Sequence, residues 1–228
     1  KCKGDWILQL DADEIVSNEL KNEISTVINS TSNSTNSTNP PAGGPIQPVA
    51  YWLPRLNHFL GTPLTKGGQY PDPTIRLYKN GVARYPCKTT HEQVEITPPN
   101  GVDQKAETSQ AGSLILDLHY DQQKDKEYIG HLQKPLLHYP WPSIQDYFNK
   151  ALIRYSTHEA IRLHDLGMKP SFWGGVKFLV ILPIVWFLKT YFRHRGYVDG
   201  FAGFVFSLFS SLRYWITYVH LVELERQK

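Results

Sequence analysis

The segment at residues 6–14, Trp-Ile-Leu-Gln-Leu-Asp-Ala-Asp-Glu, constrains the fold of this chain more than any other stretch. A short and almost continuous apolar run of this kind is typical of a strand buried on both faces of a parallel α/β sheet. The run ends at Asp11, Asp13 and Glu14, so these carboxylates are expected at the carboxyl end of the strand. Open α/β sheets bind their ligands at that edge, so we expect an α/β protein with a ligand site there.

Asp11 and Asp13 are candidate metal ligands because residues two apart in an extended strand point the same way. Hard oxygen ligands suit Mg²⁺ or Mn²⁺, which proteins bind through one or two carboxylates plus substrate phosphates. The alternative is a solvated acidic turn before a helix, which is the commoner role of an isolated Asp-x-Asp. An amphipathic helix expected over residues 16–28, with Ser17 or Asn18 as its N-cap, supplies the context that favours the metal.

Residues 4–14 resemble the Asp-x-Asp segment of family-2 glycosyltransferases with the GT-A fold. The resemblance is closest to the bacterial branch that includes lipopolysaccharide-core β-glucosyltransferases, in which the aspartates hold a divalent ion against the diphosphate of a nucleotide-sugar. It implies a partial, Rossmann-like mixed sheet and a metal at Asp11 and Asp13. Because the only methionine is Met168, residue 1 is not an initiator, and the resemblance implies that the first half of the nucleotide-binding sheet is missing. The chain alone could then be inactive.

The next part of the chain fits the family's order of an aromatic-Pro-Arg strand, a Gly-Gly loop and an Arg-Leu-aromatic strand. Arg55 and Arg76 fall in the two strands, and a guanidinium offers a planar fork for the donor diphosphate. The alternative for each is a strand-end arginine paired with a structural carboxylate, and for Arg76 the two interpretations have equal weight. Asp72 stands between two prolines, so a turn residue is slightly favoured there over a ligand-facing carboxylate.

His91 and Glu92 form the second candidate group. A lone His-Glu pair is usually a surface feature, but the family resembled here carries such a pair in its active site. Inverting sugar transfer needs a base that takes the proton of the acceptor hydroxyl. We expect Glu92 to be that base, with Asp72 as second choice and His91 positioning the donor or contacting its phosphates.

Several further segments are assigned by composition and period. Residues 29–48 are rich in Ser, Thr, Asn, Pro and Gly and are expected to form a flexible low-complexity surface insertion. A strand is expected over 113–119 and a helix over 143–160. The Leu-His-Tyr sequence around His138 resembles another family segment, although a structural histidine is the better interpretation.

The C-terminal part changes character, so we expect a division into a GT-A part at 1–165 and an apolar helical tail at 166–228. Its two apolar runs, 172–192 and 201–212, are aromatic-rich and flanked by Lys and Arg. The first run contains Pro183, and Arg213 follows the second. Such helices suit the membrane interface, where rings sit at headgroup level and basic groups meet anionic lipid. Two short spans, or packing on the catalytic part or on a partner, remain alternatives.

Together these features predict an inverting, metal-dependent glycosyltransferase at the cytoplasmic face of a membrane. It would move a sugar from a nucleotide-sugar donor to a glycolipid or cell-surface polysaccharide. The net charge of +3 gives no argument for nucleic acid, and two cysteines without close spacing indicate neither a zinc site nor a disulfide framework. One alternative is a non-catalytic, membrane-associated scaffold of the same fold. The other is a Mg²⁺-dependent nucleotidyltransferase, which would need a Gly-rich phosphate loop that is not visible here.

Overall fold

The computed structural model describes residues 2–34, 47–85, 94–97 and 126–227. The chain forms two compact units. Unit 1 comprises Lys1–Arg55 and Asp72–Leu137, and unit 2 comprises Leu56–Pro71 and His138–Lys228. The segment 138–165, which we had expected to group with the first part of the chain, therefore groups with the C-terminal helices.

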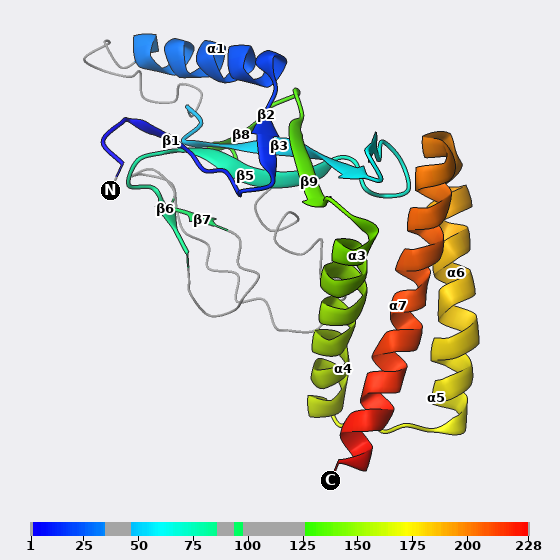
Figure 1. Cartoon of the computed structure of the whole chain (residues 1–228). Helices are drawn as coiled ribbons and strands as arrows, with labels where there is room; N and C mark the ends of the chain where they lie inside the picture. Colours follow the sequence, from blue (N-terminus) through cyan, green and yellow to red (C-terminus); the bar gives the residue numbers. More distant parts are fainter. Residues whose placement is uncertain (1, 35–46, 86–93, 98–125, 228) are drawn as a thin grey trace. The chain divides into compact units, whose positions relative to one another are not determined.

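A mixed sheet carries the order β1-β5-β3-β9-β2, with β4 and β8 also paired to β3 (Figure 1). The strands of this sheet are β1 Trp6–Leu8, β2 Glu14–Val16, β3 Ala50–Phe59, β4 Thr62–Pro63, β5 Asp72–Lys79, β8 Ile129–His131 and β9 Leu136–Trp141. β5 is antiparallel to both β1 and β3, whereas β8 is parallel to β3. A separate pair is formed by β6 Ala83–Arg84 and β7 Glu95–Ile96. The α/β expectation and the two central strands are thus confirmed.

The expectation that the first strand is doubly buried between parallel neighbours is wrong. β1 is the end strand of the described sheet and runs antiparallel to β5, with Leu8 opposite Leu77. Its three residues are only partly buried, because β5 alone pairs with it among the described strands. A continuous apolar run does not distinguish a central strand from an end strand that packs on both faces.

Apolar side chains cover both faces of β3 in unit 1. Ala50 and Trp52 belong to one buried cluster, while Tyr51 and Leu53 belong to another that includes residues of helix α1. This alternation follows from the two-residue period of a strand. The long central strand therefore fixes both layers of the core of unit 1.

Helix α1, Asn18–Ser34, packs on the sheet through Leu20 and Ile24. Ser17 is its N-cap, as expected, since the Ser17 hydroxyl accepts the backbone N–H of Leu20 at 3.1 Å. The helix continues to Ser34, so the expectation of a loop from residue 29 is wrong for residues 29–34, while 35–46 lie outside the described residues. The expected strand at 113–119 also lies outside them.

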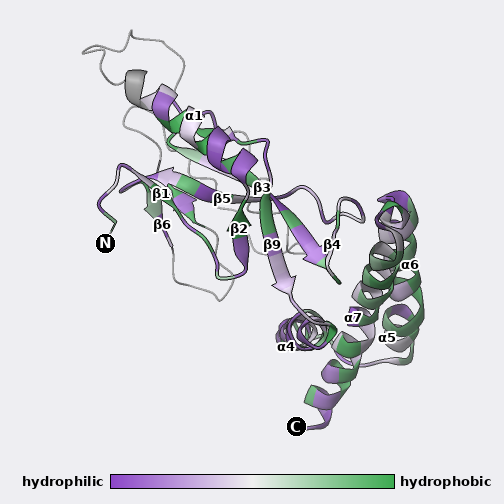
Figure 2. Cartoon of the chain, turned by 45° about the horizontal axis from the view of Figure 1, so that its top comes forward, coloured by the Kyte–Doolittle hydropathy of each residue, from purple (hydrophilic) through white to green (hydrophobic). Residues whose placement is uncertain are grey.

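Unit 2 contains three long helical segments, drawn in green, yellow and red in Figure 1. The first consists of α3 Ile144–Asp146, η1 Tyr147–Arg154 and α4 Tyr155–Asp165, with Ser143 as N-cap. The second consists of α5 Phe172–Val176, η2 Lys177–Ile181, α6 Leu182–Leu188 and η3 Lys189–Arg193. After the short η4 Gly196–Asp199, α7 Gly200–Arg226 packs against both, with α4 and α6 on opposite sides of it (Figures 1 and 2).

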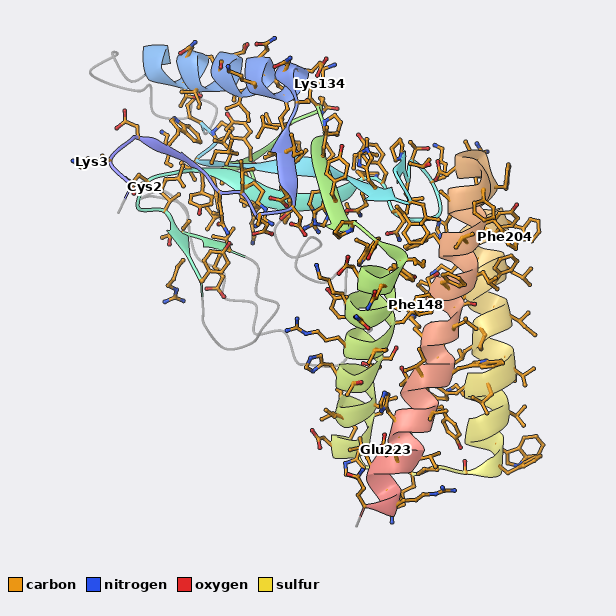
Figure 3. The ribbon with its side chains drawn as sticks, viewed as in Figure 1. Cys2, Lys3, Lys134, Phe148, Phe204 and Glu223 are labelled. Atoms are coloured by element: carbon orange, nitrogen blue, oxygen red, sulfur yellow. The ribbon has the colours of Figure 1, made fainter. Side chains whose placement is uncertain are left out.

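Stacked and edge-on aromatic rings form the core where these helices meet. Phe59, Tyr147 and Phe206 lie within 4.9 to 6.0 Å of one another between ring centroids. Phe148 points from its helix toward α7, where it meets Phe209 at 5.1 Å (Figure 3). The aromatic content of 13% thus has a packing role in unit 2.

Hydrogen bonds to Asp199 join the loop after β4 to the turn before α7. Its carboxylate accepts hydrogen bonds from the backbone N–H and the hydroxyl of Thr65, at 3.1 and 2.6 Å, and from the N–H of Lys66 at 2.8 Å. The next residue, Gly67, has a φ of +67° and donates its N–H to the carbonyl of His194 at 2.9 Å. The Gly-Gly loop therefore makes contacts within unit 2.

The second helical segment continues through Pro183, and α7 continues through Arg213. Proline has no N–H to donate to the carbonyl four residues earlier, at Leu179. The indole N–H of Trp215 donates to that carbonyl at 2.7 Å. The guanidinium of Arg213 lies 3.9 Å from the ring centroid of Trp186. Contacts between the two helices thus accommodate both residues.

We expect Gly203→Ala to destabilise unit 2 by about 2 kcal/mol, the usual cost of overpacking. A Cβ at this position would lie 2.0 Å from the backbone oxygen of Gly196. A backbone atom cannot relieve such a clash by a change of rotamer, so the helix itself would have to shift. Gly175→Ala is the matched control, because a Cβ there would meet Tyr218 at an ordinary 3.6 Å. Denaturant unfolding measures both, and equal stability of the two variants would contradict this packing.

We expect Trp215→Phe to lower stability by about 1 kcal/mol, because it removes the hydrogen bond to the Leu179 carbonyl and keeps an aromatic ring. Trp173→Phe serves as the control, since Trp173 is 77% exposed. Thermal unfolding of both variants tests this expectation. A loss no larger than that of the control would mean that the hydrogen bond contributes nothing to stability.

Candidate active site at the turn between β1 and β2

The turn between β1 and β2 holds the acidic cluster that the sequence singles out. Asp11 and Asp13 lie in the turn itself, and Glu14 opens β2. The backbone N–H of Glu14 donates to the carbonyl of Asp11 at 3.1 Å, and the N–H of Asp11 donates to the Glu14 carboxylate at 3.0 Å. The two aspartates are therefore held by a closed turn, not by the extended strand that we assumed.

Glu14 is the buried centre of this group. Its side chain is fully buried and accepts hydrogen bonds from Nε and Nη2 of Arg76, at 3.2 and 2.9 Å. Arg76 also donates to the carboxylate of Asp11, so one guanidinium joins the turn to β5. Burial by itself lowers the pKa of Arg76, but its hydrogen bonds and charge interactions with Glu14 and Asp11 outweigh burial, and the pKa lies above its ordinary value.

Arg55 and Asp72 form a second ion pair beside the first. The two residues are directly opposite each other in the ladder between β3 and β5, and Nη2 of Arg55 lies 2.7 Å from Oδ2 of Asp72. Nη1 of Arg55 also lies 3.8 Å from the Glu14 carboxylate. The turn interpretation of Asp72 is wrong, because this residue begins β5.

Both arginines therefore bind carboxylates of their own chain. Within the described residues, however, the buried Nε of Arg55 makes no hydrogen bond. Asp11, Glu14 and Asp72 carry three formal negative charges against two positive charges on the arginines, which leaves a net charge of −1 before Asp13 is counted. The group thus carries a small net negative charge, which favours the binding of a cation over that of an anion.

At the turn, Asp11 and Asp13 offer at most two carboxylates to a divalent ion, which would then need further oxygens from a substrate. Half of the Asp11 side chain is exposed, and Asp13 lies two residues away in the same turn. Within the described residues, no three His, Cys, Asp or Glu side chains are grouped so that they could hold a metal by themselves. Two carboxylates with substrate phosphates and water are a usual magnesium environment, so the fit depends on a phosphorylated ligand.

Three further residues were singled out from the sequence, namely His91, Glu92 and His138. His91 and Glu92 lie outside the described residues. His138 belongs to unit 2, where its Nδ1 lies 2.6 Å from Oδ1 of the buried Asn57, an arrangement that favours the structural interpretation.

Sequence reasoning missed the central role of Glu14 and the contacts of Gln9. The side-chain oxygen of Gln9 accepts hydrogen bonds from the hydroxyls of Tyr78 and Tyr85, at 2.9 and 2.7 Å. A polar residue inside an apolar run, such as Gln9 between Leu8 and Leu10, is a signal that could have found this contact.

Comparison with known proteins finds relatives in Rickettsia. The chain is 28% identical over 229 residues to an uncharacterized glycosyltransferase of Rickettsia typhi, matching 98% of this chain and 64% of that protein. An uncharacterized glycosyltransferase of Rickettsia prowazekii is 27% identical over 214 residues, matching 91% of this chain and 58% of its own length. One of Rickettsia bellii is 28% identical over 229 residues, with 99% and 64% matched.

The chain thus spans about three fifths of the length of these curated relatives. No protein-family model matches the chain. No solved structure matches it.

We expect Glu14→Leu to destabilise unit 1 by about 3 kcal/mol, because it leaves the buried guanidinium of Arg76 without its main partner. Arg76→Met should cost a similar amount, and the double variant should lose less than the sum of the two. Glu95→Leu is the control, since its ion pair with Arg84 is exposed and should contribute at most about 1 kcal/mol. Additive losses in urea unfolding would mean that the pair is not coupled.

Proposed function

We propose that this chain is the larger part of an inverting glycosyltransferase. It would transfer a sugar from a nucleotide-sugar donor to a hydroxyl of a glycolipid or a cell-surface polysaccharide. The observation that supports it most is the turn of Asp11 and Asp13, which the buried pair of Glu14 and Arg76 holds beside Arg55. The relatives named as glycosyltransferases support the same reaction class.

The donor diphosphate would bind at this turn. Asp11 and Asp13 would hold Mg²⁺ or Mn²⁺ there, and such an ion neutralises the charge that develops on the leaving diphosphate. The guanidinium of Arg55, whose side chain is 22% exposed, would donate to a phosphate oxygen at the same place. Arg76 acts through Asp11, since it holds that carboxylate in position.

The transfer forms one bond and breaks another at the anomeric carbon. The acceptor oxygen attacks that carbon from the side opposite the diphosphate, and the bond to the diphosphate breaks. The proton of the acceptor hydroxyl passes to a base, for which we propose Glu92. Asp72 is the second choice, because Arg55 already holds its carboxylate at 2.7 Å. His91 would contact or position the donor.

A non-catalytic scaffold is the rival function, and one observation favours it. Both arginines of the group are paired with carboxylates of their own chain, as in a purely structural ion-pair network. The scaffold predicts weak metal binding and no transfer by the full-length protein. The experiment below separates the two functions.

We expect the full-length protein to turn over one nucleotide-sugar with Mn²⁺ when donors are screened for hydrolysis and transfer. Asp13→Ala should abolish the metal-dependent turnover, and Glu92→Gln should reduce turnover by about 10²- to 10⁴-fold, the usual contribution of a general base. Asp5→Ala and Glu95→Gln are matched controls that remove exposed carboxylates. Their turnover should equal that of the unchanged protein.

Three outcomes would change the proposal. Turnover that survives Glu92→Gln would move the base to Asp72. Turnover that persists without metal would remove the role of Asp11 and Asp13 as ligands. A folded full-length protein that neither turns over a donor nor binds nucleotide with Mn²⁺ in calorimetry would favour the scaffold.

A further inference from the structure

Unit 2 exposes an unusual amount of apolar surface on two neighbouring helices. Of the 25 large apolar side chains that are exposed in the described residues, 15 lie between Phe172 and Val219. On the second helical segment they recur every three or four residues, as one stripe along a helix. The members of this stripe are Val180, Ile181, Ile184, Val185, Leu188 and Phe192.

A second stripe runs along α7 and joins the first. Its members are Phe201, Phe204, Leu208, Trp215 and Val219. The ring of Phe204 lies 6.0 Å from that of Phe187 and 5.7 Å from that of Tyr191, and Figure 3 shows it beside α6. Because Trp215 also donates to the carbonyl of Leu179 in the second helical segment, the two stripes form one surface, which we call the apolar face.

The apolar face does not include α4, which packs on the other side of α7 (Figures 1 and 2). The described part of α4 carries ionic groups, among them Arg162, which is paired with Glu159 at 2.6 Å. An apolar patch of this extent marks an interaction surface, not the ordinary surface of a monomeric protein.

Basic residues border the apolar face, and acidic ones are nearly absent from it. Lys177, Lys189, Arg193 and Arg195 are all exposed. The one acidic residue between positions 172 and 222 is Asp199, which is bound to Thr65 and Lys66. This combination of aliphatic side chains, aromatic rings and cations is complementary to the interface of an anionic lipid bilayer.

We infer that the apolar face docks on an anionic bilayer with both helices lying in the plane of the interface. The stripes enter the boundary between headgroups and acyl chains, and the lysines and arginines meet lipid phosphates. A shallow apolar groove of about 320 Å³ on the same helix, lined by Phe172, Gly175 and Leu179 among others, has a surface suited to part of an acyl chain.

A spanning arrangement is disfavoured by what the second helical segment packs on. By length and composition its 22 residues, Phe172–Arg193, could cross a membrane, and only 11% of the most apolar 18-residue stretch within them is buried. The segment packs along α7, however, which carries Arg213 near its middle. Spanning would take Arg213, and the ionic groups of α4 behind it, into the hydrocarbon, where each charge is costly. Lying in the interface avoids this cost.

Vesicle binding by the full-length protein tests the docking. We expect binding to vesicles of phosphatidylglycerol and phosphatidylcholine that weakens as salt is added, and little binding to phosphatidylcholine alone. Ile184→Glu should weaken binding at least about tenfold. Lys189→Gln with Arg193→Gln should weaken it about 30-fold. Ile161→Glu is the control, since Ile161 is an exposed isoleucine of α4, and its binding should be unchanged.

Depth measurements distinguish lying from spanning. Single cysteines at positions 173, 184 and 192 would carry a polarity-sensitive fluorophore, with nitroxide lipids as quenchers, in a protein whose Cys2 and Cys87 are replaced by serine. Equal shallow depth at all three positions supports the inference. A deep position 184 between shallow positions 173 and 192 would overturn it in favour of a span.

Two further results would also overturn the inference. One is unchanged vesicle binding in Ile184→Glu. The other is a stable dimer in sedimentation that Ile184→Glu dissociates, without vesicle binding, since a second copy would then cover the apolar face. The inference concerns unit 2 alone, and it adds a membrane partner to the proposed transferase. Donor hydrolysis measured without lipid tests the transferase separately, so the two can fail independently.

Discussion

The contact between the buried carboxylate of Glu14 and the guanidinium of Arg76 organises the acidic turn of unit 1. One carboxylate oxygen binds Arg76, and the other accepts the backbone N–H of Asp11. The same interaction thus joins β2 to β5 and closes the turn that carries Asp11 and Asp13. Because an unpaired charge at this depth is very unfavourable, each partner requires the other, and the turn has little freedom to open. Pre-organised carboxylates of this kind are what a metal-assisted site needs before a substrate arrives.

Much of this arrangement could be predicted from the sequence. The strand-like composition around Arg55 and Arg76, with the family's strand order, indicated two central strands, and Ser17 and Ser143 indicated the starts of two helices. The pairing of β1 with β5 could not be predicted, because a three-residue apolar run carries no information on its partner. The burial of Glu14 follows from that pairing, which places Arg76 beside it. A glutamate next to two aspartates otherwise suggests a solvated residue.

The expectations that failed did so where side chains compensate for a poor local propensity. Polar residues at the end of α1 predict a loop, yet the hydroxyls of Ser30 and Thr31 bond back to the carbonyl of Val27 within the helix. Pro183 and Arg213 lie inside helices, where Trp215 and Trp186 of the neighbouring helix contact the freed carbonyl and the guanidinium. In each case the compensating partner is a contact that composition cannot reveal.

The boundary between the two units passes through the middle of secondary structure. It separates Arg55 from Leu56 inside β3 and Leu137 from His138 inside β9, so in neither place is there a linker to cut. Proteases cleave exposed loops more readily than strands, so we expect no cleavage at these two positions. A gene fusion or truncation at either position would break the hydrogen bonds of a strand ladder. The helical unit with its apolar face is therefore not a separable module.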